Sequence, residues 1–574
     1  MRSRMIMTSV QSLTEARLRF PNSRHLLNAI GVQRLAMNKG DIMELQARIE
    51  KSRDRGGFYH EAFMAGYNAV KPVVQKWSHE EHPVLREIAV AEKLHPYMMG
   101  FGSVSTHTIG GLTVKVSPSV NSMNRFAVLN RCAAEEIAQT VELIGKDRLG
   151  EARIELAEDS PLSDTEYPSI TQFRGDVGAD LTSGINSWIL LKEEMKRKYP
   201  GFDRDGIKNV VVFGIGANDM YLRALAEAVN NDPERKADLH VAFGPEQFLK
   251  LPHSMNSENT LVIAISRSGT TQDTLKTMEF NARDGKFQHV ITLANKGPIK
   301  ELADREGYVT HPLREDIGGR YMREKGLIVL LPLLISGSQR FLTRYFDAMQ
   351  EFDSEYFPVG EKTDVIDMAS HMHFFISTFN MPQIVAMSNN PILEAGLREA
   401  MQLHNEAVGK ISNITLMGRP GMEVAPFAHA GIEGFMEMAW NAGLYGLFVF
   451  DTSTSKNQQP LPEGIPVNPK HAGLTPDQIK MAFDWPNWAK FNYVGGPNIL
   501  ITMNGTTPEN LSTLSSFYAN LIWPMLIMKG CNPTSNPQVS RVRKTTGALL
   551  ERIAENAGRD PLEVIMEEMP KVIS

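Results

Sequence analysis

Short apolar runs recur through the middle of the chain, and stretches with helical periodicity lie between them. The first four runs are Asn209–Phe213, Leu239–Phe243, Thr260–Ile265 and His289–Leu293. Continuous apolar runs of this length are typical of strands buried on both faces. Because helical segments alternate with them, the pattern predicts a parallel sheet in a doubly wound α/β domain.

The same alternation returns further along the chain, at Gln383–Met387, Leu447–Phe450 and Asn498–Thr502. We therefore predict two doubly wound parallel-sheet domains, each with three αβα layers, and helical segments at both ends of the chain. The predicted division is a mostly helical N-terminal segment, a first and a second α/β domain, and a C-terminal helical tail: residues 1–165, 166–350, 351–530 and 531–574.

The longest apolar run, Gly326–Gly337, is shorter than the ~20 residues that a membrane span needs and contains Pro332. It predicts a buried core helix, and we expect no membrane association. The basic N-terminus lacks the apolar stretch of a secretory signal. A frayed terminus is the expectation there, and an organelle transit peptide is the alternative.

Composition narrows the function classes only a little. The 574 residues carry a formal net charge of -6 and contain two cysteines. The chain has no excess of basic residues, so its composition does not suggest a nucleic-acid partner. Two cysteines are too few for a disulfide scaffold or a Cys-rich metal site, and they fit a reducing compartment.

The most specific pattern is the stretch 265–274, Ile-Ser-Arg-Ser-Gly-Thr-Thr-Gln-Asp-Thr, between a predicted strand and a predicted helix. A helix N-terminus offers free N–H groups and a partial positive charge, and hydroxyl groups add further donors for a phosphate. The alternative is an ordinary Ser/Thr N-cap, which needs one or two hydroxyls. The hydroxyls here number five, on Ser266, Ser268, Thr270, Thr271 and Thr274.

This stretch resembles the phosphosugar-binding loop of the sugar isomerase (SIS) superfamily, Ser-x-Ser-Gly-x-Thr-x-x-Thr. It is also similar to the Ser-Lys-Thr-x-Thr-Thr-Gln-x-Thr loop of phosphoglucose isomerases. Upstream, residues 214–219 (Gly-Ile-Gly-Ala-Asn-Asp) resemble that family's Gly-Ile-Gly-Gly-Ser-Asp loop, with a plain strand–helix turn as the alternative. The resemblance implies substrate binding by Gly216, Ala217, Asn218, Ser266, Arg267, Ser268, Thr270, Thr271 and Gln272.

Two further motifs follow in the family's order. Asp316–Tyr321 is similar to Val-Gly-Gly-Arg-Tyr-Ser, which implies that Arg320 stabilises an enediolate oxygen. Asn405–Lys410 is similar to Glu-Ser-Asn-Gly-Lys, and the helical pattern before it resembles the second SIS domain of glucosamine-6-phosphate synthase. Both alignments imply that Glu406 is the general base. The neighbouring Glu394, Glu399 and Glu423 are expected to be solvated charges.

The remaining family roles leave alternatives open. The ring-opening His position falls on Trp440, and the nearest substitute is His429, with Glu433 and His404 in reserve. For the family's C-terminal Lys, counting residues selects Arg543, whereas charge type selects Lys544, because Arg does not give up its proton usefully. A solvated helix face is the alternative for this basic group.

The resemblance covers roughly residues 200–550. It implies a divergent phosphoglucose isomerase that interconverts glucose 6-phosphate and fructose 6-phosphate through a cis-enediol. It further implies no metal or organic cofactor, a cytoplasmic location and a homodimer with shared active sites. The alternatives are an isomerase of another phosphosugar, such as mannose 6-phosphate, and a non-catalytic phosphosugar sensor, which would need neither Glu406 nor Arg320.

Overall fold

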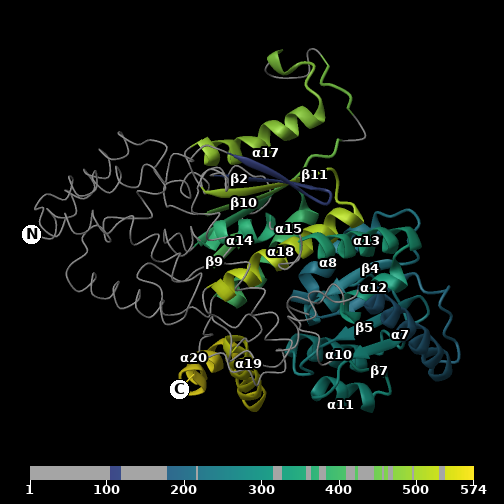
Figure 1. The fold of residues 1–574 in the computed structure, drawn as a ribbon. Coiled ribbons are helices and arrows are strands. Elements are labelled where there is room, and N and C mark those ends of the chain that lie inside the picture. Colours follow the sequence, from purple (N-terminus) through teal and green to yellow (C-terminus); the bar gives the residue numbers. More distant parts are fainter. Residues whose placement is uncertain are drawn as a thin grey trace, which may run out of the picture. The chain divides into compact units, whose positions relative to one another are not determined.

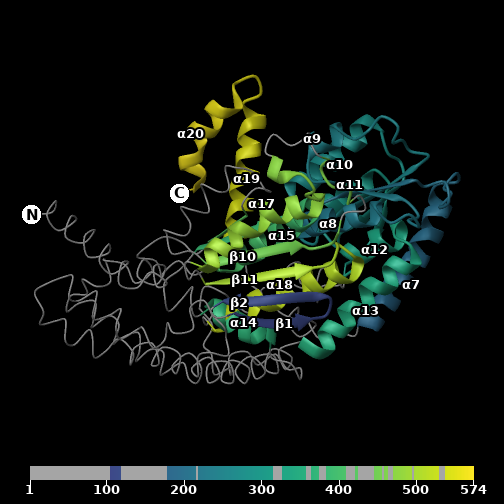
Figure 2. The ribbon, with the colours of Figure 1, turned by 90° about the horizontal axis from the view of Figure 1, so that it is seen from above.

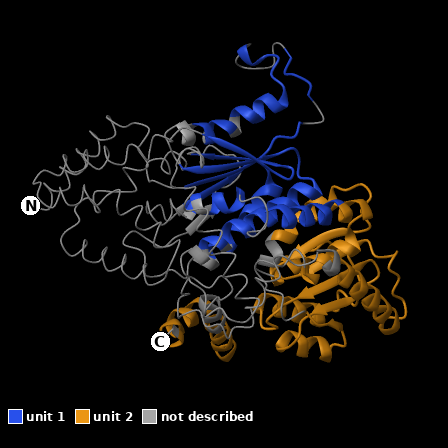
Figure 3. Cartoon of the chain, viewed as in Figure 1, with its two compact units in different colours: residues 1–156, 344–531 blue, residues 157–343, 532–574 orange. Residues whose placement is uncertain are grey.

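The computed structural model describes twelve stretches of the chain (Figure 1), and the description below is confined to them: 104–117, 177–214, 217–313, 326–356, 364–373, 383–408, 421–424, 445–454, 458–462, 469–493, 497–528 and 537–573. The chain divides into two compact units (Figure 3). Unit 1 combines residues 1–156 with 344–531, and unit 2 combines 157–343 with 532–574. The division into four segments remains a prediction.

Unit 2 contains a five-stranded sheet of order β4-β3-β5-β6-β7, and all its strand pairs are parallel. The strands are β3 (Asn209–Phe213), β4 (Asp238–Ala242), β5 (Thr260–Ile265), β6 (Val290–Leu293) and β7 (Val309–His311). The four strands predicted for this region are therefore confirmed, with two of them shifted or shortened by one residue. Every residue of β5 is buried, as expected for a central strand covered on both faces.

The helices of unit 2 are α7 (Val177–Lys198), α8 (Ala217–Asn230), α9 (Pro245–Leu249), α10 (Gln272–Asp284), α11 (Pro298–Arg305), α12 (Leu327–Ser336), α19 (Pro537–Glu555) and α20 (Pro561–Ile573). Helix α13 (Gln339–Tyr356) crosses the boundary between the units. The predicted core helix corresponds to α12. It packs closely on α7, because a Cβ on Gly184 would lie 1.9 Å from Leu330 Cδ2. No described helix is long and apolar enough to cross a membrane.

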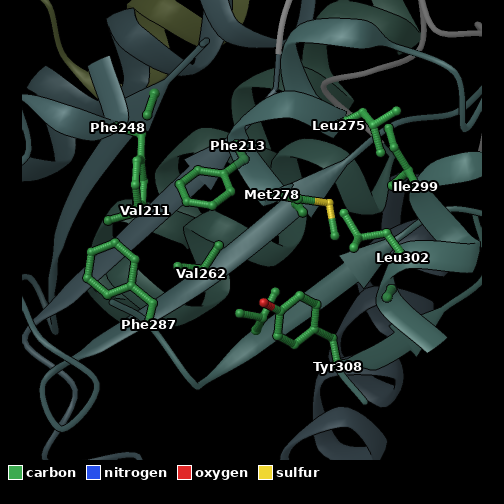
Figure 4. Packing of buried hydrophobic residues seen from close by; sticks show 14 of the residues in the cluster. Val211, Phe213, Phe248, Val262, Leu275, Met278, Phe287, Ile299, Leu302 and Tyr308 are labelled. Atoms are coloured by element: carbon green, nitrogen blue, oxygen red, sulfur yellow. The ribbon is translucent and has the colours of Figure 1, made fainter. Parts of the chain in front are cut away.

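One apolar cluster joins the sheet of unit 2 to α9, α10 and α11 (Figure 4). Phe248 lies between Phe213 and Phe287 and meets each ring edge to face, with centroids 5.8 and 6.1 Å apart. Leu275 and Met278 of α10 are buried in the same cluster. Full burial of such side chains contributes about 1.5–3 kcal/mol each, so this packing holds the start of α10 firmly against the sheet.

Unit 1 contains a six-stranded sheet of order β1-β2-β11-β10-β8-β9. Strands β8 (Gln383–Ser388), β9 (Gly421–Val424), β10 (Tyr445–Asp451) and β11 (Asn498–Met503) are parallel. The hairpin of β1 (Ser105–Ile109) and β2 (Leu112–Ser117) adds to this sheet antiparallel to β11, as Figure 2 shows. The prediction of a second parallel α/β domain is thus confirmed, with a mixed edge that the strand pattern did not reveal.

Helices cover both faces of the sheet in unit 1 (Figure 1). Helix α17 (Pro476–Tyr493) lies on one face, and α14 (Asp364–His373), α15 (Pro391–Val408) and α18 (Pro508–Met528) lie on the other. The three-layer αβα arrangement predicted from the sequence is therefore present.

Each parallel sheet has one point where the order of its strands reverses. In unit 2 the chain passes from β3 outward to β4, and then returns to β5 on the other side of β3. In unit 1 it passes from β8 to β9, and later to β10 on the other side of β8. The connections that follow the two inner strands lead to opposite sides of the sheet at the carboxyl ends of these strands. Open α/β sheets bind their ligands at such switch points.

Candidate functional site

The hydroxyl-rich loop lies at the switch point of unit 2, between β5 and α10. Ser266 is 2% exposed, and its Oγ lies 2.9 Å from Thr271 Oγ1. The same Oγ accepts a hydrogen bond from the backbone N–H of Gly269 at 3.1 Å. The Ser266 hydroxyl therefore closes the loop on itself and sets its curvature.

The N-cap alternative for this loop does not describe its geometry. Thr271 occupies the N-cap position of α10, but its side chain makes no capping hydrogen bond and instead contacts Ser266. Among the described residues, none accepts a hydrogen bond from the N–H groups of residues 272–274. These donors lie at the positive end of the α10 dipole, the arrangement that binds anions.

The outer part of the loop is more exposed. Thr270 donates to Ser268 Oγ from its backbone N–H at 3.3 Å and from its hydroxyl at 3.1 Å. Arg267 and Gln272 are half-buried beside them. The loop thus combines hydroxyl groups, one guanidinium group and a helix N-terminus, which together suit a dianionic phosphate group.

Gly269 is required at the tip of the loop. Its φ is +69°, and an added Cβ would lie 1.6 Å from the carbonyl oxygen of Lys296. The Gly269 carbonyl also accepts the N–H of Ile299 at 3.1 Å. The hydroxyl loop is therefore supported by the β6–α11 loop, residues 294–297, which the motif pattern did not single out.

The second predicted glycine loop follows β3 at the same switch point. A Cβ on Gly214 would lie 3.9 Å from the carbonyl oxygen of Ile265, so the ends of β3 and β5 are adjacent. Helix α8 begins at Ala217 and contains Asn218 in its first turn. Gly216 and the side chains of Ala217 and Asn218 lie outside the described residues. Both α8 and α10 therefore begin at the carboxyl ends of adjacent strands of unit 2.

The predicted catalytic residues are described only in part. Glu406 lies in the last turn of α15, which confirms its expected position near a helix end, and Arg543 and Lys544 lie in α19. Their side chains are outside the described residues. Arg320, His429, Glu433 and Trp440 are also outside the described residues. Their proposed roles remain predictions.

One expectation about the neighbouring acids is wrong. Glu399 is 1% exposed, so it is buried and is not a solvated charge. The reason is that α15 packs on the sheet of unit 1 and on α18, and Glu399 belongs to the covered face. His404 is buried on the same helix. Glu394 instead pairs with Arg398 on the outer side, at 2.5 Å between Oε1 and Nη2.

Asp451 was not singled out by the sequence either. It ends β10 and is 8% exposed. Its Oδ1 accepts the backbone N–H groups of Ser453 at 2.8 Å and Gly505 at 3.0 Å, and Oδ2 accepts Asn390 Nδ2 at 3.1 Å. Burial alone raises the pKa of Asp451, but hydrogen bonds from the backbone and hydroxyl of Ser453 and from the Gly505 N–H, together with the charge of Lys480, outweigh it and hold the pKa below its usual value. In the described parts of the chain, no group of three or more His, Cys, Asp or Glu side chains is arranged to hold a metal ion.

The chain is similar in sequence to known isomerases. No family model matches the chain. A glucose-6-phosphate isomerase of Thermus thermophilus is 25% identical over 272 residues, which are 45% of this chain and 62% of that protein. Another, from Symbiobacterium thermophilum, is 23% identical over 423 residues, 66% of this chain and 90% of the relative. The chain thus matches less than two thirds of the length of the Thermus relative.

A solved structure agrees at the level of the fold. The glucose-6-phosphate isomerase of Chlamydia trachomatis superimposes with a TM-score of 0.58 at 14% identity, over 82% of this chain and 93% of that one. This likeness concerns the fold, which in this chain comprises two α/β units and a hydroxyl-rich loop at the switch point of one of them. The chain is therefore similar to glucose-6-phosphate isomerases in sequence, and similar to one of them in fold.

Proposed function

We propose that the protein is an aldose–ketose isomerase that interconverts glucose 6-phosphate and fructose 6-phosphate. The observation that carries the proposal is the loop 266–271, where a buried hydroxyl, further exposed hydroxyls and a helix N-terminus meet at the switch point of a parallel sheet. The similarity of the chain to glucose-6-phosphate isomerases supports the same substrate class.

In the proposed complex, Ser266, Ser268 and Thr271 hold the phosphate. One hydroxyl of the Ser266–Thr271 pair donates to the other, so this pair has one hydroxyl proton left for a phosphate oxygen, and Ser268 supplies another. Arg267 adds a permanent positive charge and a planar pair of donors. Thr270 and Gln272 complete this side of the proposed site, and the start of α8 contributes Gly216, Ala217 and Asn218. Phosphate binding of this kind holds the substrate by its phosphate group and so positions the sugar relative to the protein. The chemical step is carried out by other groups.

The proposed chemical step needs one carboxylate. Glu406 takes the C2 proton of the open-chain aldose, and the electron pair of that C–H bond forms the C1–C2 double bond of the cis-enediolate. Arg320 stabilises the negative charge that develops on oxygen. Glu406 then returns the proton to C1, the hydroxyl proton on the C2 oxygen passes to the C1 oxygen, and the C2 oxygen becomes the ketone carbonyl. His429 and Lys544 are the proposed groups for opening the sugar ring, by moving protons between the ring oxygen and the C1 hydroxyl.

The test is a coupled assay of glucose 6-phosphate formation from fructose 6-phosphate, with the wild type, Glu406→Gln and Glu394→Gln. We expect turnover by the wild type, a fall in kcat of about 100-fold or more for Glu406→Gln, and a near wild-type rate for Glu394→Gln. Glu394 is a matched control because it lies on the same helix and pairs with Arg398.

The outcomes separate the alternatives. If the wild type binds phosphosugars without turning them over, the isomerase proposal is wrong and a sensor remains. Turnover of mannose 6-phosphate in place of glucose 6-phosphate would change the substrate and keep the mechanism. A wild-type rate in Glu406→Gln would remove only the assignment of the base.

A homodimer with shared active sites and a cytoplasmic location belong to the same proposal, since both are implied by the family resemblance. Light scattering coupled to size-exclusion chromatography tests the first of them. A particle of about twice the 64.1 kDa chain mass supports the homodimer, and a single-chain mass contradicts it.

A further inference from the structure

The β6–α11 loop, residues 294–297, lies against the tip of the hydroxyl loop. The Lys296 carbonyl oxygen occupies the space that a side chain on Gly269 would need. From the other side, a Cβ on Gly297 would lie 3.0 Å from the Gly269 carbonyl oxygen. Two tight backbone approaches therefore fix residue 296 beside the proposed phosphate site.

This loop is also tied to the next strand end. The Asn295 side chain donates to the Leu313 carbonyl at 2.8 Å and accepts the Leu313 N–H at 2.6 Å. Such a two-point contact limits the movement of the loop, because both polar groups of Leu313 would otherwise lose their partner. The backbone of Lys296 is thus held between two anchored neighbours, Asn295 and Gly297.

The Lys296 side chain differs from the next lysine along the chain. Lys296 is exposed and forms no ion pair with any residue in the described ranges. Lys300, one turn into α11, holds both carboxylate oxygens of Asp304 at 2.6 Å. An ammonium group on a flexible stem that has no carboxylate partner remains available for an anion.

We propose that Lys296 is a further phosphate-binding residue of this site, reaching the bound phosphate from the β6–α11 loop. The inference rests on the proposed function of the hydroxyl loop. The backbone of Lys296 approaches Gly269, which stands between Ser268 and Thr270 in the chain, and a lysine stem is long and flexible. Its ammonium group supplies a mobile point charge, and it complements the fixed donors of α10 and the planar guanidinium group of Arg267.

Isothermal titration with inorganic phosphate at low ionic strength tests this role in Lys296→Met, Lys296→Arg, Lys300→Met and Ser266→Ala. We expect Lys296→Met to weaken phosphate binding about fivefold, Lys296→Arg to keep most of it, and Lys300→Met to have no effect. Lys300→Met removes the same charge from the same segment and controls for net charge. The affinity of Lys296→Met should also depend less on salt than that of the wild type.

Each outcome bears on the inference. An unchanged affinity in Lys296→Met, together with a weakened one in Ser266→Ala, overturns the role of Lys296 and leaves the hydroxyl loop as the phosphate site. Equal losses in Lys296→Met and Lys300→Met also overturn it, because they report a general charge effect. If the wild type binds no phosphate, both this inference and the proposed function fail. Because Lys296 is exposed, thermal melting should show all these lysine variants folded.

Discussion

In both units a loop follows an inner strand at the switch point of the sheet. The two loops differ in which group accepts the hydrogen bonds of their backbone N–H groups. In unit 2, β5 ends on the apolar Ile265, and the Ser266 hydroxyl accepts the N–H of Gly269. In unit 1, β10 ends on Asp451, whose carboxylate accepts the N–H groups of Ser453 and Gly505. Hydroxyl residues follow both strands, since residues 452–454 are Thr-Ser-Thr.

The difference shows how one fold position serves two purposes. A buried carboxylate that accepts several N–H groups acts as an internal anion, so the donors in unit 1 are already satisfied by the chain. In unit 2 a neutral hydroxyl shapes the loop, and the first N–H groups of α10 have no acceptor among the described residues. We infer that the unit 2 loop is the one suited to a phosphate, whereas the unit 1 loop is structural.

The strongest test of the comparison replaces one glycine in each loop region. Gly269→Ala places a Cβ 1.6 Å from the Lys296 carbonyl, whereas in Gly505→Ala the nearest atom lies at 3.6 Å. Both residues have positive φ, which alone costs about 1–2 kcal/mol for a residue with a side chain. We therefore expect Gly269→Ala to lose more than about 3 kcal/mol of unfolding free energy, measured in urea, and Gly505→Ala about 1–2 kcal/mol.

Phosphate binding by the same two variants provides the control. Gly505→Ala should bind inorganic phosphate as the wild type does, and Gly269→Ala should not bind it measurably. Equal stability losses in the two variants would mean that the loop of unit 2 relaxes away from Lys296. The close approach of Gly269 to the Lys296 carbonyl would then not be needed for function.

A smaller effect is expected when one hydroxyl group is removed from each loop. Ser266→Ala removes the acceptor of the Gly269 N–H and the contact with Thr271. We expect phosphate affinity to fall about tenfold, which corresponds to the loss of one buried hydrogen bond of about 1.4 kcal/mol. Ser453→Ala removes a hydroxyl hydrogen bond to Asp451 but retains the backbone N–H that this carboxylate accepts, so phosphate affinity should be unchanged. A tenfold loss in Ser453→Ala would contradict the structural role of the unit 1 loop.

The elements that could be predicted from the sequence are those fixed by neighbours along the chain. The β5 strand and the loop after it were recognisable because a continuous apolar run is followed directly by clustered hydroxyls. The position of Glu406 near the end of α15 followed from the helical periodicity before it. In each case the residues that determine the structure are adjacent in sequence.

What was missed depends on partners far away in the chain. Strand β2 pairs with β11, in a register that places Leu112 opposite Met503, and no local pattern specifies that partner. The contact between Gly269 and Lys296 joins two loops, so the need for glycine was visible only in three dimensions. Glu399 looked solvated because its charge was considered without the packing of α15 against α18.

The smallest expected effect concerns the internal carboxylate of unit 1. Because hydrogen bonds hold the pKa of Asp451 below that of the unfolded chain, the ionised group adds stability above the unfolded pKa of about 3.9. That contribution is lost as the pH falls through the folded pKa. Asp451→Asn keeps an amide oxygen as acceptor but turns an N–H₂ group toward Asn390. We expect it to cost about 1 kcal/mol at pH 7.

Urea unfolding of the wild type and Asp451→Asn at several pH values measures this difference. The gap between the two unfolding free energies should be widest near neutral pH and narrow below about pH 4, because the wild-type carboxylate becomes protonated there. Phosphate affinity at pH 7 should be the same in both proteins. If the difference in unfolding free energy stays constant down to low pH, Asp451 stabilises unit 1 by its shape and not by its charge. The contrast between an internal carboxylate in unit 1 and the N–H groups at the start of α10 in unit 2, which have no acceptor among the described residues, would then not be electrostatic.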